Sequence, residues 1–128
     1  MTGKLVLGLG CRKGESADVL RQLVKSTLAK GEVSDSALSV VATLDGKQLE
    51  PAIAMLSRSL GLPVVTFSAA RLEEETPRLA NPSDVVFRET GCHGVAEAAA
   101  LAAAGEGAWL LVEKQVLDGC TAAIAMRA

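Results

Sequence analysis

The sequence is poor in aromatic residues: it has two phenylalanines, one tryptophan and no tyrosine. Proteins that hold single-stranded nucleic acids use aromatic side chains that stack on the bases, with basic residues beside them. The aromatic residues here, Phe67, Phe87 and Trp109, are not interleaved with basic residues in that way. The formal net charge of −2 gives no bulk attraction to nucleic acid or to an anionic membrane surface. We therefore expect neither nucleic acid nor a membrane as a partner.

Long hydrophobic runs and paired cysteines are also missing. The longest uninterrupted apolar run, residues 98–104, is far shorter than a bilayer-spanning helix requires, and the apolar stretch 5–7 is too short for a signal-peptide core. The three cysteines, Cys11, Cys92 and Cys120, are an odd number without C-x-x-C spacing. This argues against a disulfide framework and fits a reducing compartment. We therefore expect a cytoplasmic protein.

The 128 residues that are present suit a single domain, which we predict over residues 1–128, and 49% of them are hydrophobic. Charge is unevenly spread along the chain. Residues 1–30 carry six basic and two acidic side chains, whereas the remainder is net acidic. An anionic ligand would therefore favour the end of the fold that contains Arg12 and Lys13.

The apolar periodicity predicts strands and helices in alternation. We expect strands at 4–9, 37–43, 64–67, 108–113 and 121–126, and helices from the Ser16 cap to Gly31, at 48–60, after the Ser83 cap, and at 95–104. Residues 71–78 are predicted as a solvated turn or short helix, and Asp118-Gly119 as a hairpin turn. This order predicts an α/β fold: a three-layer α/β/α sandwich with a mostly parallel, mixed sheet of about five strands and one antiparallel pair near the C-terminus.

The first predicted strand leads into a glycine-rich basic segment, Gly8-Leu-Gly-Cys-Arg-Lys-Gly14. A strand that ends in glycines and feeds a helix places its turn at the carboxyl edge of a sheet, where α/β folds bind ligands. Backbone N–H groups there can contact an anion, and Arg12 could hold a carboxylate or phosphate bidentately. The segment lacks the lysine-serine ending of a phosphate loop and the third glycine of a dinucleotide motif. Local chemistry leaves an anion site and a plain tight turn equally open.

Polar residues at other element ends could reach the same edge. Thr43-Leu-Asp45-Gly-Lys47 follows the second strand and offers a hydroxyl, a carboxylate and an ammonium, although Asp45 could instead cap the next helix. Lys114 and Thr121 lie at strand ends, where solvation alone would explain them. Glu97 interrupts an apolar helix, and burying its carboxylate without a partner would be costly. Glu97 could lie on an exposed stripe of its helix, or it could anchor the turn at Cys11 or the turn at Thr43. Its spacing in the sequence does not decide between these alternatives.

The segment Gly91-Cys92-His93-Gly94 precedes the same helix and contains the single histidine. Cys92, His93, Cys11 and Cys120 could converge as metal ligands, but none has the adjacent-ligand spacing of zinc or iron sites, so we predict no metal. A cysteine–histidine nucleophile is equally conceivable, yet no third group can be named that would orient the histidine.

Taken together, these segments resemble, in order, the cobalamin biosynthesis family formed by CobE and the C-terminal domain of CbiG. The similarity covers nearly the whole chain, and the first turn and the Val95-Ala-Glu-Ala-Ala segment are its most specific parts. The segments that carry it are Gly8-x-Gly-Cys-Arg-x-Gly14 with Ser16, Ala42-Thr-Leu-Asp-x-Lys47 with Glu50, Pro82-Ser83, Gly91-x-x-x-Val-Ala-Glu-Ala-Ala-Ala100, Lys114 and Thr121-x-Ala-Ile-Ala125.

This resemblance implies a role in building the corrin ring. In the family, multidomain CbiG opens a ring lactone of a cobalt-containing precorrin and releases acetaldehyde. This chain has room only for the C-terminal domain and resembles free-standing CobE in length. Precorrins carry many carboxylates around a flat apolar ring, so basic residues could capture the carboxylates while leucine and valine walls replace the missing aromatic residues.

We therefore predict a protein without a cofactor that holds or delivers a precorrin or corrinoid intermediate, with other corrin-pathway enzymes as further candidate partners. A hydrolytic step on the ring lactone, with Glu97 or Asp45 as the base, is the alternative. It ranks second because the sequence offers no nucleophile–base pair. A generic phosphate or nucleotide module, which rests on the glycine turn alone, ranks third. The predicted ligand-binding residues are Gly8, Gly10, Cys11, Arg12, Gly14, Ser16, Thr43, Lys47, Ser83, Gly91, Lys114 and Thr121.

Overall fold

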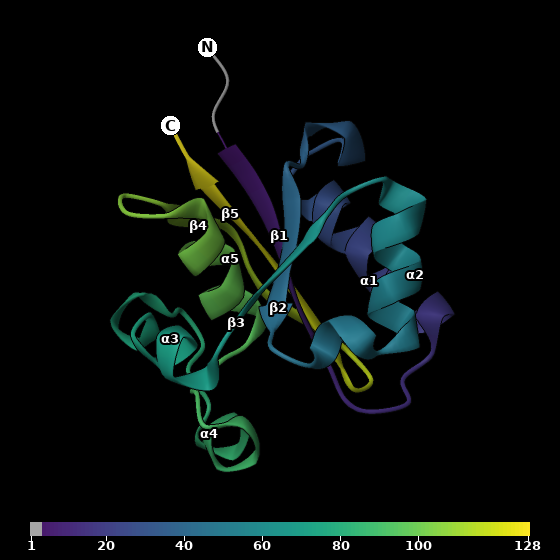
Figure 1. The fold of residues 1–128 in the computed structure, drawn as a ribbon. Helices are drawn as coiled ribbons and strands as arrows, with labels where there is room; N and C mark the ends of the chain where they lie inside the picture. The colour runs from purple at the N-terminus through teal and green to yellow at the C-terminus, as the bar shows by residue number, and fades with distance from the viewer. Residues whose placement is uncertain (1–3) are drawn as a thin grey trace.

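The structure, a computed structural model, describes residues 4–128 and contains a five-stranded sheet with helices on both faces (Figure 1). The strands are β1 (Lys4–Cys11), β2 (Val40–Leu44), β3 (Val64–Phe67), β4 (Trp109–Leu117) and β5 (Cys120–Arg127). Their order across the sheet is β3-β2-β1-β5-β4. β1, β2 and β3 pair in parallel, and β5 is antiparallel to both β1 and β4. The α/β sandwich with a mixed sheet is therefore confirmed.

The helices are α1 (Ala17–Lys30), α2 (Pro51–Leu60), α3 (Ala69–Glu73), α4 (Asp84–Thr90) and α5 (Ala96–Ala104), with short 3₁₀ turns η1 (Asp35–Ala37), η2 (Lys47–Leu49) and η3 (Thr76–Arg78). α1 and α2 cover one face of the sheet, and α5 covers the other (Figure 1). No helix within residues 4–128 is long and apolar enough to cross a membrane.

Alternation along each strand divides the core into two clusters. Leu7 and Leu9 of β1 pack with Leu20 of α1 and Ile53 of α2 on one face. Val6 of β1 packs on the other face, with the alanines of α5 and with Ala42 and Ala125 of the neighbouring strands. Large aliphatic side chains therefore fill the first layer, and alanines make up most of the second.

α5 approaches β1 very closely, and Gly8 is the reason. A Cβ built on Gly8 would lie 2.0 Å from the Ala96 carbonyl oxygen and 2.9 Å from the Ala100 Cβ. A Cβ on Gly10 would lie 2.5 Å from the Thr121 hydroxyl and 3.4 Å from the Val95 Cβ. The two glycines therefore allow an alanine helix to rest directly on the strand backbone.

Several element boundaries differ from the sequence prediction. β1 continues two residues beyond the predicted strand, to Cys11, so Gly10 lies inside the strand rather than in a turn. Residues 35–37 form η1 and β2 begins only at Val40, while residues 47–49 form η2 and α2 begins at Pro51. The sheet has two antiparallel pairings rather than one, because β5 inserts between β1 and β4.

Candidate functional site

The carboxyl ends of β1, β2 and β3 lie at one edge of the sheet, at the bottom of Figure 1. The turn 12–16 follows β1, η2 follows β2, and α3 begins just after β3. The hairpin between β4 and β5 reaches the same edge, because Cys11 pairs with Cys120. Ligands in open α/β sheets bind outside the carboxyl ends of the strands, so this edge is the candidate site.

The turn after β1 already contains carboxylate contacts. The Arg12 backbone N–H donates to the Gly119 carbonyl, and Gly14, at φ +80°, donates its N–H to Glu50 Oε1 at 2.9 Å. The Arg12 guanidinium lies 3.9 Å from the Glu89 carboxylate, and both side chains are largely exposed. Of the basic segment predicted from the sequence, Arg12 and Gly14 therefore do lie at the edge, each beside an acidic residue.

Three of the predicted ligand residues have local structural roles. The Ser16 hydroxyl accepts from the Asp18 and Val19 N–H groups at the start of α1, which confirms the predicted N-cap. The Ser83 hydroxyl likewise accepts from the Val86 N–H at the start of α4. Gly91, at φ +87°, ends α4 in the left-handed conformation. Whether any of these residues also contacts a ligand stays a prediction.

The Thr43–Lys47 segment is partly buried. Thr43 is fully buried, and its hydroxyl donates to the Leu9 carbonyl at 2.7 Å, which joins β2 to β1. Asp45 is exposed and does not cap the following helix, so that alternative is wrong: the cap residues are Gly46 for η2 and Glu50 for α2, and neither caps its helix through a side-chain hydrogen bond. Lys47 lies in η2 beside Leu49, whose side chain is 79% exposed.

Glu97 is buried at 2% exposure, so its placement on an exposed stripe is wrong. Its Oε1 accepts from the Ala80 and Asn81 N–H groups, and its Oε2 accepts from the Asn81 side-chain amide and the Lys114 N–H, all at 2.9–3.0 Å. Four donors compensate the desolvated carboxylate. Glu97 therefore joins α5 to β4 and to the loop before α4, and not to the turns that follow β1 or β2.

Thr121 lies opposite Gly10 in the sheet, beside Val95 at the start of α5. Lys114 lies in the irregular part of β4 and donates its backbone N–H to Glu97. The structure therefore brings Gly10, Thr121, Glu97 and Lys114 to the α5 side of the sheet.

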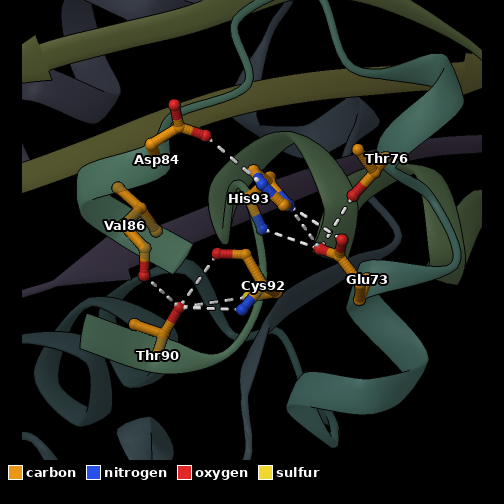
Figure 2. Close-up of polar contacts among 7 residues, drawn as sticks. All are labelled: Glu73, Thr76, Asp84, Val86, Thr90, Cys92 and His93. Carbon is orange, nitrogen blue, oxygen red and sulfur yellow. Dashed lines mark hydrogen bonds and ion pairs between the residues drawn. The ribbon is translucent and has the colours of Figure 1, made fainter. Parts of the chain in front are cut away.

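The single histidine is held between two acidic residues (Figure 2). His93 Nδ1 lies 2.8 Å from Glu73 Oε2, and Nε2 lies 3.5 Å from Asp84 Oδ1. The ring stacks on Phe87 with the centroids 4.4 Å apart. Burial tends to raise the pKa of Glu73, but hydrogen bonds from Thr76 and His93 and the His93 charge outweigh it and lower this pKa. Glu73 thus supplies the orienting group that the sequence did not reveal.

The four candidate metal ligands do not converge. Cys11 and Cys120 face each other with their sulfurs 3.6 Å apart, on the α1 side of the sheet. Cys92 packs on the α5 side, near Thr90. Burial, with the neighbouring Cys120, raises the pKa of Cys11 to about 12. Residues 4–128 contain no group of three or more His, Cys, Asp and Glu side chains that could hold a metal ion.

The predicted site residues therefore divide between the two faces of the sheet. Cys11, Thr43, Lys47, Gly14 and Ser16 lie toward α1 and α2, and the others lie toward α5 and α4: Gly8, Gly10, Arg12, Ser83, Gly91, Glu97, Lys114 and Thr121. Two surface hollows contain none of them. One, of about 480 Å³, lies between β3 and the end of α5, and the other, of about 350 Å³, is lined by Arg71, Arg78 and Gly105.

Exposed apolar side chains also occur on the segments at the carboxyl edge. Leu49 is in η2, Val85 and Phe87 are in α4, and Val116 is near the hairpin. The edge thus combines basic, acidic and apolar surface, a composition suited to a ligand with an apolar body and charged substituents.

Comparison with known protein families gives one match over nearly the whole chain. The family model described as cobalamin synthesis G C-terminus matches residues 5–125. Protein CobE from Sinorhizobium sp. is 47% identical over 121 residues, which are 94% of this chain and 79% of that protein. Cobalt-precorrin-5A hydrolase from Priestia megaterium is 31% identical over 87% of this chain, but the matched region is only 29% of the hydrolase.

Solved structures give the same match. The crystal structure of CobE, a protein from the cobalamin biosynthetic pathway, has a TM-score of 0.91 and 42% identity, covering 100% of this chain and 93% of that one. Cobalamin biosynthesis protein chiG from Agrobacterium tumefaciens has a TM-score of 0.73 and 34% identity, covering 97% of this chain and 98% of that one.

Proposed function

Because the chain belongs to the family of the cobalamin synthesis G C-terminus and is a cobalamin biosynthesis protein, we propose that it binds a precorrin or related corrinoid intermediate at the carboxyl edge of β1, β2 and β3. In this proposal the protein holds or delivers the intermediate. Arg12, Lys47 and Lys114 bind peripheral carboxylates, and the exposed apolar residues contact the ring.

One observation carries this assignment: basic and exposed apolar side chains occur together on the segments at a single edge of the sheet. Arg12 follows β1, Lys47 and the exposed Leu49 follow β2, and Val85 lies on α4, the helix that Arg12 contacts through Glu89. A macrocycle with an apolar body and many carboxylates requires this combination. Each exposed ion pair contributes no more than about 1 kcal/mol, so useful affinity requires several of them together.

The proposal is tested with cobyrinic acid, a corrin whose side-chain carboxylates are free, and with its heptamethyl ester as the matched neutral ligand. An absorbance titration should show binding of the acid and, because the ester offers no anionic groups, at least about tenfold weaker binding of the ester. Arg12→Ala should weaken binding of the acid about threefold to tenfold, because it removes a bidentate donor. Lys30→Ala, at the exposed far end of α1, is the control and should leave binding unchanged. Equal affinity of wild type and Arg12→Ala would refute this site.

A second candidate function is a hydrolytic step on the ring lactone. The Glu73–His93 contact favours it, because a carboxylate at Nδ1 orients a histidine for general base work at Nε2. The exposed Asp84 carboxylate, 3.5 Å from Nε2, would have to move aside for the substrate. Asp45 and Glu97 are the other candidate bases; Asp45 is exposed, whereas the Glu97 oxygens are taken up by four hydrogen bonds. Release of acetaldehyde from a lactone-bearing precorrin, lost in His93→Gln, would favour the enzyme. Release of acetaldehyde that His93→Gln leaves unchanged would exclude His93 as the general base.

We also propose that the protein works in the cytoplasm and that other corrin-pathway enzymes are its partners. The three free, buried cysteines support a reducing compartment.

A further inference from the structure

Two acidic side chains of the protein contact residues that the sequence predicts to bind the ligand, Gly14 and Arg12. Glu50 Oε1 accepts from the Gly14 N–H at 2.9 Å, and Glu89 Oε1 lies 3.9 Å from Arg12 Nη2. Each carboxylate occupies a position in which a ligand carboxylate would be bound. A ligand carboxylate can bind at either position only if it displaces the protein carboxylate already there. The weaker of the two internal contacts is therefore the one that a ligand displaces.

The Glu50 contact is the stronger of the two. It is a short hydrogen bond between a carboxylate and a backbone N–H, a class about twice as strong as neutral hydrogen bonds. Glu50 also directly precedes Pro51, where α2 begins, so its side chain links the turn after β1 to the start of a packed helix. Release of this contact would disturb the structure of the turn, and Glu50 is therefore a structural group.

The Glu89 contact is weak. Its 3.9 Å separation is at the limit of an ion pair, and the side chains of Arg12 and Glu89 are 71% and 50% exposed. Pairs of this kind contribute little stability in water, because solvent screens both charges and ordering two long side chains costs entropy. A ligand carboxylate that binds Arg12 bidentately would therefore displace Glu89 at small cost.

The position of Glu89 on α4 adds an apolar contact. α4 has no buried residue, so its outward side chains are available to a ligand. Val85 is four residues before Glu89 and therefore lies on the same side of the helix, with 49% of its side chain exposed. A ligand whose carboxylate reaches Arg12 from this side would bring its ring edge against Val85.

We propose, on the basis of the function proposed above, that Glu89 is an internal competitor for the carboxylate subsite at Arg12. A peripheral carboxylate of the corrinoid replaces Glu89 on the guanidinium, and Val85 contacts the macrocycle that carries this carboxylate. The free protein thus holds its own acidic group where the ligand's acidic group binds.

The test is a double-mutant cycle with cobyrinic acid and its heptamethyl ester as probes. Glu89→Gln should tighten binding of the acid about threefold, the size expected when a weak exposed pair is removed. In the Arg12→Ala background the same change should have no effect, because the competition acts through Arg12. Glu106→Gln removes an exposed charge beyond the end of α5 and should change neither affinity. Val85→Ser should weaken binding of the acid and the ester alike.

The outcomes separate this inference from the proposed function. Tighter binding by Glu89→Gln that disappears without Arg12 supports the inference. Wild-type binding that Glu89→Gln leaves unchanged, or tightening that persists in Arg12→Ala or is matched by Glu106→Gln, overturns the inference and leaves the proposed function standing. Absence of corrin binding by wild type and all variants overturns both. Far-ultraviolet circular dichroism and thermal melting of each variant exclude loss of fold as the cause.

Discussion

The two faces of the sheet are packed by different means. On the α1 and α2 face, leucine, isoleucine and valine side chains fill the space between the layers. On the α5 face, alanines and Gly8 bring a helix backbone into direct contact with a strand backbone. The first face can lose atoms and partly relax, whereas the second has no room for an added atom. The carboxyl edge is therefore flanked by a thin helix layer on one face and a thicker one on the other.

The largest expected effect is on the α5 face. Gly8→Ala places a Cβ 2.0 Å from the Ala96 carbonyl oxygen, and neither backbone can move without separating α5 from β1. We expect a loss of on the order of 4 kcal/mol in the free energy of unfolding, above the usual range for overpacking because the clash involves backbone. Urea denaturation measures it. Gly94→Ala is the control for the generic cost of replacing a glycine, because Gly94 is outside the left-handed region and a Cβ there would meet only the end of the Leu79 side chain, at 3.1 Å. Equal losses in the two variants would contradict the close-contact account.

On the opposite face, Leu20→Ala should destabilise by about 3 kcal/mol, the cost of a large-to-small change in a buried position. Leu20 is fully buried between α1 and the sheet. This variant should remain folded at moderate temperature, and a small apolar molecule that fills the cavity should recover part of the loss. A loss below about 1 kcal/mol would show that this face collapses around the cavity.

Glu97→Gln tests the polar part of the α5 face. The amide nitrogen would replace one carboxylate oxygen and confront N–H donors, so about 2 kcal/mol of stability should be lost. Glu113→Gln is the matched control, because Glu113 is exposed and meets the same Asn81 amide only at 3.4 Å. If both variants unfold at the same urea concentration, the four hydrogen bonds of Glu97 contribute nothing net.

The smallest expected effect concerns acid stability near α4. The pKa of Glu73 is lowered below its ordinary value of 4.5 in the folded protein. Its contribution to stability is therefore fully present above that value and is lost as the pH falls through the lowered pKa. Glu73→Gln should flatten the pH dependence of stability in this acidic range, as measured by urea unfolding at a series of pH values. A profile that matches wild type would show that the His93 contact does not persist in solution.

Much of the fold could be predicted from the sequence because its signals are local. Ser16 and Ser83 begin helices, and Gly61 and Gly105 end them, as their positions beside apolar periodic segments indicate. The insertion of β5 between β1 and β4 could not be predicted in the same way. Strand order depends on contacts between residues far apart in the chain. The hydrophobic pattern of a strand does not indicate which other strands it pairs with.

The candidate site was also predicted less completely than the helix boundaries, because it depends on contacts between residues far apart in the chain. The residue types at the carboxyl edge were visible, but Glu97 binds backbone N–H groups of Ala80 and Asn81, which carry no sequence signature. The Glu73–His93 contact spans 20 residues and joins a segment expected to be solvated. The sequence predicts Gly10 in the turn after the first strand, since a glycine pattern does not distinguish a turn from a strand against which a helix packs closely.

The central place of β5 also affects the order in which the molecule can assemble. Cys11 and Cys120 are paired although 109 positions separate them, and β4 reaches the rest of the sheet only through β5. During synthesis on the ribosome, β1 has an open edge until residues 120–127 have left the exit tunnel. We therefore expect the nascent chain to expose this edge until β5 has been made, and truncations before residue 120 to aggregate rather than yield a smaller folded unit.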